Sequence, residues 1–281
     1  MIVFDKIALT TASLEFEFDV YPKKNSQYIL LSATGLGPMP IEVNTTSTIH
    51  PGSVYSGTQI QEREVVITFR LNPDWKTGQS YSELRNRLYS TLSGGRGNYV
   101  TVTIGSGEDQ AELTGYVNNI DVSIYTRTPE VQISIRCPNP LLRSTKEDVY
   151  YAVESSTTIG EDTWWEYSAS INNEDAAPTG FVAEAALQTH ITTEFELETT
   201  LSEKLRVVGP PSDLTLEDSF VVNTNSGSRD VTSVRYGNFI GFLMPDSKWP
   251  ILSSTTEEVV FRSKTRAHGV QFKVRKQWWG L

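Results

Sequence analysis

The sequence predicts a mainly β protein, with an N-terminal β-barrel or sheet domain that carries one α-helix and a C-terminal β-sandwich. Short runs rich in threonine, valine, tyrosine and isoleucine alternate apolar and polar residues between turn-forming segments, which is typical of strands. Convincing helical spacing over several turns occurs in residues 80–92. With 281 residues, 38% of them hydrophobic, the chain has room for two domains of ordinary size.

The first half predicts a strand, a helix and then four more strands. Residues 64–70 alternate β-branched and aromatic residues until Pro73, which lacks the donor that a ladder needs. Ser80 and Glu83 have the spacing of a capping box, Leu84 and Leu88 lie on one helical face, and two glycines end the helix at 94–95. The strands that follow are predicted at residues 99–104, 111–117, 119–125 and 130–136.

A Cys-Pro-Asn-Pro segment at residues 137–140 stops the last of these strands, because proline cannot continue a ladder. The sequence therefore predicts two domains, residues 1–145 and residues 146–281. Strands of the second domain are predicted at residues 149–153, 163–171, 181–188, 192–198, 204–208, 219–223, 231–236, 258–262 and 269–275. Short strands at this spacing favour a β-sandwich or a β-barrel.

The sequence lacks the motifs of common enzyme classes. It contains no nucleophile elbow, no phosphate-binding loop and no His-Glu-x-x-His pattern. Carboxylates on distant strands leave a glycoside hydrolase as a third and distant alternative. Cys137, the single cysteine, has no disulfide partner and is predicted to be a buried, small apolar residue. We therefore expect no enzyme activity, no catalytic residues, no cofactor and no metal site.

Neither a membrane helix nor a signal peptide is expected. No apolar run reaches the roughly 18 residues that a membrane helix needs, and residues 1–6 lack the basic and then apolar order of a signal peptide. The sequence thus predicts a protein that is assembled in a cytoplasm without membrane insertion.

The formal net charge is −10, and the acidic excess lies in residues 146–281. This balance disfavours nucleic-acid recognition, which needs a basic surface. The end of the sequence is nevertheless basic, with no acidic residue after Glu258. This run is interpreted either as a solvated face or as a contact with an acidic surface of a neighbouring subunit. The residues concerned are Arg262, Lys264, Arg266, Lys273, Arg275 and Lys276 on the basic side, and Glu194, Glu196 and Glu198 on the acidic side.

Aromatic residues cluster in the second domain, at Trp164, Trp165 and Tyr167. Adjacent residues of a strand point to opposite faces, so one tryptophan can enter the core while the other stays outside. The tryptophan that stays outside the core is then available for a subunit interface, or for stacking against a sugar ring.

The order of these features resembles that of siphophage distal tail proteins. The first half contains a Tyr-Ser-Gly segment at residues 55–57, a strand that begins with Arg63, the helical pair Tyr81 and Arg85, and the exit at residues 137–140. Residues 171–179, 214–227 and 243–252 are similar to landmarks of the second half. The resemblance covers nearly the whole chain, and departs from the family at residues 14–44 and at Asn173, where a glycine is usual.

The resemblance implies a structural virion protein. Six copies would form a ring at the distal end of the tail, built by the first domain, and the second domain would project outwards. The ring would join the tail tube protein to the baseplate hub or tail-associated protein, with tape-measure and receptor-binding proteins as further partners. DNA would pass through without specific binding. The resemblance also implies a galectin-like second domain, which the strand spacing does not distinguish from an OB-like barrel.

Two sets of site residues follow from the resemblance and from the aromatic cluster. The candidate subunit-interface residues are Tyr55, Arg63, Tyr81, Arg85 and Arg96. The alternative function is a carbohydrate-binding host-adhesion protein of the tail tip, for which the candidate glycan or interface aromatics are Trp164, Trp165 and Tyr167.

Overall fold

The computed structural model divides into two compact units. Unit 1 comprises Met1–Lys146 together with Trp278–Leu281, and unit 2 comprises Glu147–Gln277. The last four residues of the sequence therefore lie in unit 1, whereas the sequence placed all of residues 146–281 in the second domain. The structure describes residues 5–11, 15–21, 26–39, 41–47, 53–92, 99–106, 110–123, 128–159, 162–187, 192–200, 203–211, 218–234 and 237–281.

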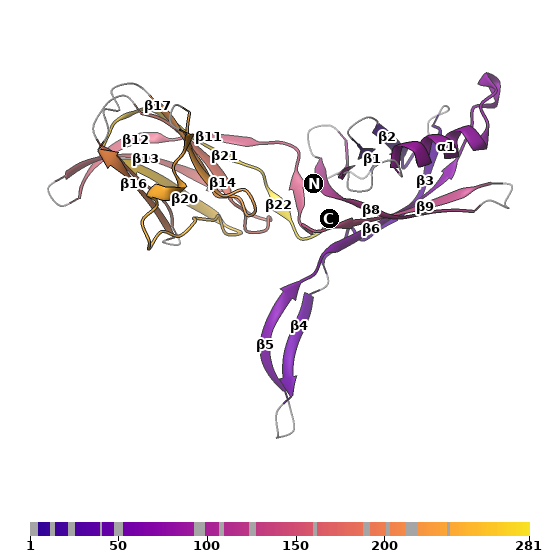
Figure 1. Ribbon diagram of the computed structural model, residues 1–281, viewed down its shortest axis with the longest axis horizontal. Helices are drawn as coiled ribbons and strands as arrows, with labels where there is room; N and C mark the ends of the chain where they lie inside the picture. Colours follow the sequence, from indigo (N-terminus) through magenta and orange to yellow (C-terminus); the bar gives the residue numbers. More distant parts are fainter. Residues whose placement is uncertain are drawn as a thin grey trace. The chain divides into compact units, whose positions relative to one another are not determined.

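Unit 1 is built around a closed barrel (Figure 1). Within the described residues, seven strands form it: β1 (Lys6–Thr10), β2 (Glu15–Asp19), β3 (Tyr28–Thr34), β6 (Arg63–Leu71), β7 (Val100–Ile104), β8 (Ala111–Val122) and β9 (Glu130–Cys137). The long strand β8 closes the barrel, because its first half pairs with β7 and its second half pairs with β9. Beyond β8 the sheet continues through β10 (Leu142–Ser144) to β22 (Gln277–Trp278).

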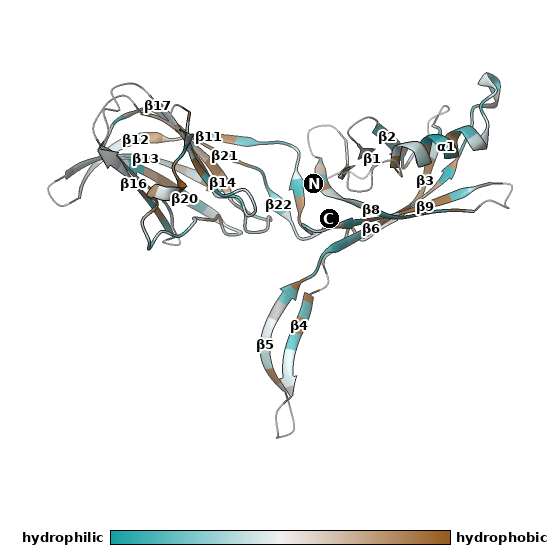
Figure 2. Ribbon diagram, in the orientation of Figure 1, coloured by the Kyte–Doolittle hydropathy of each residue, from teal (hydrophilic) through white to brown (hydrophobic). Residues whose placement is uncertain are grey.

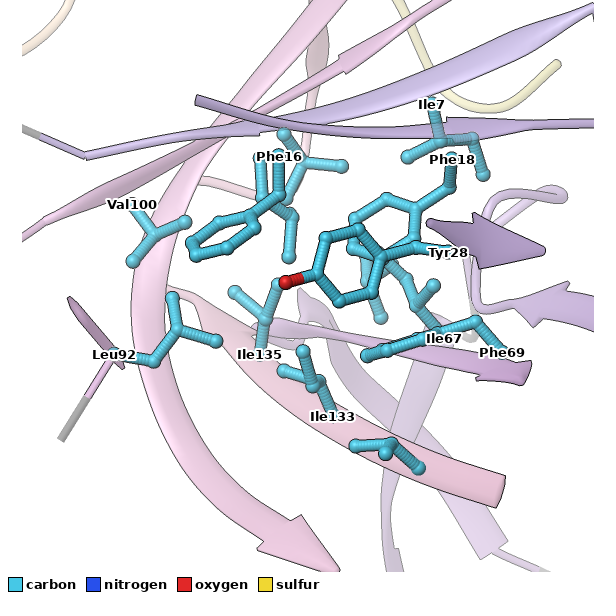
Figure 3. Close-up of a cluster of buried hydrophobic side chains, with 14 of the residues drawn as sticks. Ile7, Phe16, Phe18, Tyr28, Ile67, Phe69, Leu92, Val100, Ile133 and Ile135 are labelled. Atoms are coloured by element: carbon cyan, nitrogen blue, oxygen red, sulfur yellow. The ribbon is translucent and has the colours of Figure 1, made fainter. Parts of the chain in front are cut away.

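Alternation along the strands fills the barrel with apolar side chains. Val65, Ile67 and Phe69 of β6 are fully buried, as their period of two predicts. Tyr28 meets Phe16 and Phe69 edge-on, with ring centroids 5.6 and 5.7 Å apart (Figure 3). Aromatic rings prefer this arrangement because the positive edge of one faces the negative face of the other.

The single α-helix of the described chain, α1 (Tyr81–Leu92), covers this core with Leu84, Leu88 and Leu92. The capping box is confirmed: the Glu83 N–H donates to Ser80 Oγ at 3.2 Å, and the Ser80 N–H donates to a Glu83 carboxylate oxygen at 2.9 Å. A short 3₁₀ helix, η1 (Trp75–Thr77), precedes α1. Gly94 and Gly95, predicted to end α1, lie outside the described residues.

Two strands of unit 1 form a sheet of their own. β4 (Ile41–Ser47) and β5 (Ser53–Ile60) pair antiparallel as a hairpin and share no ladder with the barrel (Figure 1). The sequence did not predict this hairpin. The polar residues 44–46 lie in β4, and the Tyr-Ser-Gly segment at residues 55–57 lies in β5. The register shifts between Asn44, which pairs with Gly57, and Thr45, which pairs with Tyr55, so Ser56 is the extra residue of a β-bulge on β5.

Unit 2 contains two sheets. In the described residues the six-stranded sheet consists of β11 (Asp148–Tyr151), β21 (Ala267–Val274), β14 (Phe181–Leu187), β17 (Asp218–Asn223), β18 (Asp230–Ser233) and β19 (Gly237–Asn238), in that spatial order. The five-stranded sheet consists of β12 (Val153–Ile159), β13 (Asp162–Asn172), β20 (Thr256–Ser263), β15 (Thr192–Thr199) and β16 (Lys204–Pro211). A 3₁₀ helix, η2 (Ile240–Phe242), follows β19.

Both sheets of unit 2 contribute to one core. Phe181 and Phe272 come from the six-stranded sheet, whereas Phe195 and Phe261 come from the five-stranded sheet and stack with centroids 5.3 Å apart. Two separate sheets around a shared core make a β-sandwich, not a single closed barrel of the OB type. The mainly β fold class is therefore confirmed.

The strands predicted at residues 64–70, 130–136 and 181–188 are present as β6, β9 and β14, whereas β1, β3, β10 and most of β12 were not predicted. Residues 111–117 and 119–125 were predicted as two strands, but β8 runs without interruption from Ala111 to Val122. Its register shifts between Val117 and Asn119, so the polar segment is a bulge within one strand. Conversely, the strand predicted at 149–153 divides into the ends of β11 and β12, which belong to different sheets.

Candidate assembly surfaces

The β4–β5 hairpin carries an exposed apolar face in unit 1. Ile41 and Val43 alternate on β4 and are 62% and 57% exposed; Ile60 lies opposite Ile41, and Tyr55 lies opposite Thr45. Directly opposite residues of paired strands share a face, so these side chains form one surface. The reverse face is polar apart from Val54. Apolar residues on β4 and β5 are visible in Figure 2.

An isolated two-stranded hairpin in water is marginally stable, because it has no layer against which to bury its apolar side. Large exposed apolar patches in soluble proteins commonly mark protein contacts. Of the predicted interface residues, Tyr55 lies on this surface and is 60% exposed. Sequence reasoning missed Ile41, Val43 and Ile60. Their period of two was the available indication, and the polar residues at 44–46 obscured it.

The helical candidates lie on α1, away from the hairpin in sequence. Tyr81 is half-buried and packs against the barrel core, and Arg85 is half-buried one turn later. Exposed Tyr89 adds an aromatic ring on the following turn, which the sequence did not single out. Arg96 lies outside the described residues.

Arg63 has an internal role instead of an exposed one. It is 4% exposed, and its guanidinium donates to four backbone carbonyl oxygens within unit 1. Nε reaches Pro140 O at 2.7 Å, one Nη reaches Gly35 O and Gly37 O at 2.5 and 2.9 Å, and the other reaches Trp279 O at 2.6 Å. These donors are used inside the unit, so the side chain does not face a neighbouring subunit as predicted.

We call this group of contacts the Arg63 clasp. It joins the loop after β3, the proline-rich exit after β9 and the last residues of the sequence. The planar guanidinium suits the task, because its five N–H donors point in fixed, divergent directions. Burial lowers the pKa of Arg63 from its usual value, yet a guanidinium remains charged at neutral pH. Two further contacts strengthen the clasp: the Leu281 N–H donates to Leu36 O at 3.0 Å, and Gly280 lies so close to Gly37 that a Cβ would clash at 2.5 Å.

The three aromatic candidates of unit 2 lie mostly inside the protein. Trp164 is 4% exposed and Tyr167 is 2% exposed. The Tyr167 hydroxyl accepts from the Ala267 N–H at 2.7 Å, which fixes it in the core. Trp165 is half-buried, with the guanidinium of Arg266 over its ring at 5.0 Å. A sugar ring has no free face of Trp164 or Tyr167 on which to stack, because both rings are covered.

The outer face of the five-stranded sheet is a ladder of alternating charges. One row of directly opposed residues crosses β13, β20, β15 and β16 as Glu166, Arg262, Glu196 and Arg206. Arg262 bonds to Glu166 at 2.7 Å and also to Glu198. Opposite charges facing each other across strands stabilise a sheet. For the basic run, the sequence left open a solvated face or a contact with acidic residues of a neighbouring subunit; within this chain, two of its residues, Arg262 and Lys264, already pair with Glu198 and Glu194.

The next row of the ladder contains Trp164, Lys264 and Glu194. Lys264 lies over the Trp164 ring at 5.5 Å and bonds to Glu194 at 2.9 Å, and Arg206 pairs with the same carboxylate. Burial alone would raise the pKa of Glu194, but hydrogen bonds and positive charge from Arg206 and Lys264 outweigh it and lower the pKa. Four further basic residues of unit 2 pair with glutamates: Lys204 with Glu196, Arg266 with Glu154, Lys273 with Glu184 and Arg275 with Glu147.

Two remaining features concern chemistry: possible metal ligands and the thiol of Cys137. No group of three or more histidine, cysteine, aspartate or glutamate side chains in the described residues is placed to hold a metal ion. Burial raises the pKa of the Cys137 thiol to about 11, although the charge of Arg63 acts in the opposite direction. A thiol of this kind stays protonated and unreactive at neutral pH. None of the described helices has the length and apolarity to cross a membrane.

Protein-family models give no match, and neither do curated protein sequences. Among solved structures, the chain shares the fold of a phage distal tail protein, as the sequence resemblance predicted. SPP1 Dit, gp 19.1, aligns over 97% of this chain and 99% of its own length, with a TM-score of 0.69 and 14% identity. Phage P2 baseplate structures with calcium and with strontium align over 98% of this chain and 99% of theirs, with TM-scores of 0.49 and identities of 10% and 9%.

Proposed function

We propose that this protein is a structural component of a siphophage virion that forms a ring of six copies at the distal end of the tail. The ring joins the tail tube protein to the baseplate hub and the host-adhesion apparatus. It is assembled in the host cytoplasm, and tape-measure and receptor-binding proteins are its further neighbours. The net charge of −10 favours passage of DNA through the ring without specific binding, because like charges repel.

The observation that carries the proposal is the fold likeness to SPP1 Dit over both units. That protein is described as a paradigm of the hub adsorption apparatus of phages that infect Gram-positive hosts. The alignment covers nearly all of both chains, so neither unit is an addition foreign to that fold. The Arg63 clasp supports the same role, since a structural ring needs subunits whose segments are firmly held.

The hairpin explains how copies would associate. Its apolar face, made by Ile41, Val43, Tyr55 and Ile60, is exposed in the single chain. In a cyclic ring each subunit uses two different surfaces, one of which binds the complementary surface of the next subunit. The hairpin is the surface that binds the next subunit, and burial of its apolar face on the next copy supplies the driving force.

Electron microscopy of the purified full-length protein tests the proposal, together with light scattering coupled to size-exclusion chromatography. We expect closed rings of six subunits and a mass six times the 31.4 kDa of the chain. If the protein were to stay monomeric at every concentration and in the presence of a tail tube protein, the ring would be ruled out. Open filaments would instead show that the subunit rotation does not close.

A further inference from the structure

Unit 2 has a groove on the outer face of its six-stranded sheet, opposite the shared core. It encloses about 560 Å³, which is within the range of small-ligand sites. The residues that shape it are Tyr151, Glu184, Ala186, Ser219, Val234 and Gly269. All belong to unit 2, and none of them takes part in the charge ladder or the Arg63 clasp.

Small residues in register create the hollow. Gly269 of β21 lies opposite Ala186 of β14, and Ala186 lies opposite Ser219 of β17. The side chains in this row across three neighbouring strands are therefore very small, and the row forms the floor of the groove. Tyr151 and Val234 form the rims, and each is 77% exposed.

The carboxylate of Glu184, whose charge is balanced by Lys273, lies beside this floor. Glu184 accepts from Gln271 Nε2 and from Lys273 Nζ, both at 2.5 Å, and Tyr151 lies opposite Gln271 in the adjacent strand. The lysine balances the charge of the carboxylate. A carboxylate has about four acceptor sites and a carboxamide both donates and accepts, so the pair retains capacity for hydroxyl groups.

We propose that this groove binds a neutral oligosaccharide. Tyr151 offers an aromatic face with a polar tip for stacking on a sugar ring, and Glu184 with Gln271 offers hydrogen bonds to adjacent hydroxyls. From β11 to β18 the groove spans about 19 Å, at roughly 4.8 Å per strand. That length suits a short oligosaccharide better than a single sugar.

An extended peptide fits this groove less well. Peptides that bind sheets add to a free strand edge, where unpaired backbone groups supply the affinity. The floor strands β21, β14 and β17 are each paired on both sides, so their backbone groups are already used. An anionic ligand is disfavoured as well, because none of the described residues that line the groove carries a positive charge.

The test measures binding of cellotetraose, maltotetraose and tetra-N-acetylchitotetraose to the full-length protein, by saturation-transfer NMR and calorimetry. We expect at least one of them to bind with a millimolar or lower dissociation constant. Tyr151→Ala should weaken that binding at least fivefold, because the stacking face is lost. Gly269→Phe should abolish it, since a Cβ at Gly269 meets no atom within 4 Å and the new ring can occupy the groove without disturbing the fold.

Tyr21→Ala is the matched control, because Tyr21 is also 77% exposed but lies in unit 1. It should leave sugar binding unchanged. Circular dichroism and melting temperature verify that each variant is folded. Tyr151→Ala keeps the test decisive even if Gly269→Phe does not fold, since the side chain it removes is largely in solvent. Failure of all three sugars to bind, or binding that survives both groove variants, would overturn the assignment, whatever the oligomeric state of the protein.

Discussion

At the scale of single residues, Arg63 shows how one side chain can organise a unit. Its four carbonyl acceptors come from three segments that are distant in sequence. Buried carbonyl groups without donors are costly, so each of these bonds both stabilises its segment and satisfies the guanidinium. An arginine at the start of β6 is therefore explained by the need to hold three segments of unit 1 together.

Arg63→Lys should destabilise unit 1 although it keeps the positive charge. A lysine ammonium is a compact charge that cannot span four acceptors as a planar fork does. We expect a loss of roughly 3 kcal/mol in the free energy of unfolding, since bonds from charged donors contribute about 1.5–3 kcal/mol each. Urea denaturation measures the loss, and hydrogen exchange at the Leu281 amide should accelerate. Arg85→Lys on α1 is the control, and equal losses in both variants would contradict the clasp.

Cys137 should be inert in the folded protein. Burial raises the pKa of its thiol to about 11, so at pH 8 the thiolate is scarce. We expect reaction with a disulfide reagent such as DTNB to be on the order of 100-fold slower in the native protein than in urea. Cys137→Ser should cost about 1 kcal/mol and leave assembly intact. Fast labelling of the native protein would show that the thiol is accessible.

At the scale of elements, the charge ladder makes the five-stranded sheet sensitive to acid. A group whose pKa is lowered by folding stabilises the protein above its unfolded pKa, and that contribution is lost as the pH falls through the folded value. Glu194 is such a group, because Arg206 and Lys264 hold its pKa below the usual value. Burial of Glu184 opposes the effect of Lys273 and Gln271, but its pKa is lowered as well.

We therefore expect stability to fall as the pH approaches the ordinary glutamate pKa of about 4.3 and to keep falling below it. Glu194→Gln should be less stable than the parent at pH 7 and lose less of its stability on acidification. The urea midpoints of Glu194→Gln and of the parent, measured from pH 7 to pH 3, show how steeply the stability of each protein depends on pH. Glu258→Gln, on an exposed position of the same sheet, is the control. Parallel curves for Glu194→Gln and the parent would refute the role of the ladder.

Elements with strong local patterns could be predicted from the sequence. The capping box of Ser80 and Glu83 defined the start of α1, and alternation defined β6, β14 and β15. The Arg63 clasp could not be predicted, because its acceptors are backbone groups whose positions depend on the fold. Alternation did not say which of Trp164 and Trp165 stays outside the core, and it did not predict that Lys264 from a neighbouring strand covers Trp164. Side-chain alternation states which face a residue occupies, but not what lies over that face.

At the scale of the whole molecule, the chain leaves unit 1 after Lys146 and returns to it at Trp278. Unit 2 is thus inserted between two parts of unit 1 in sequence. The Arg63 clasp holds both of these parts, through Pro140 on one side and Trp279 on the other. A sequence boundary at a proline-rich segment marks where unit 2 begins, but the return of the last four residues has no comparable mark in the sequence.

Ring formation should depend on the apolar face of the β4–β5 hairpin and not on the tryptophans of unit 2. Val43→Asp combined with Tyr55→Ser places a charge and a polar group on that face, and we expect the mass in light scattering to fall to that of one chain, 31.4 kDa. Gln59→Asp introduces the same charge on the reverse face of the hairpin and should leave the ring intact.

Trp165→Ala should also keep the oligomeric mass, because its ring is half-buried within unit 2 beneath Arg266. The variants separate two ways of building the ring. Loss of rings in the hairpin variant, with Gln59→Asp and Trp165→Ala still assembled, places the subunit interface in unit 1. Loss of rings in folded Trp165→Ala, with the hairpin variant still assembled, would move the subunit interface to the second unit.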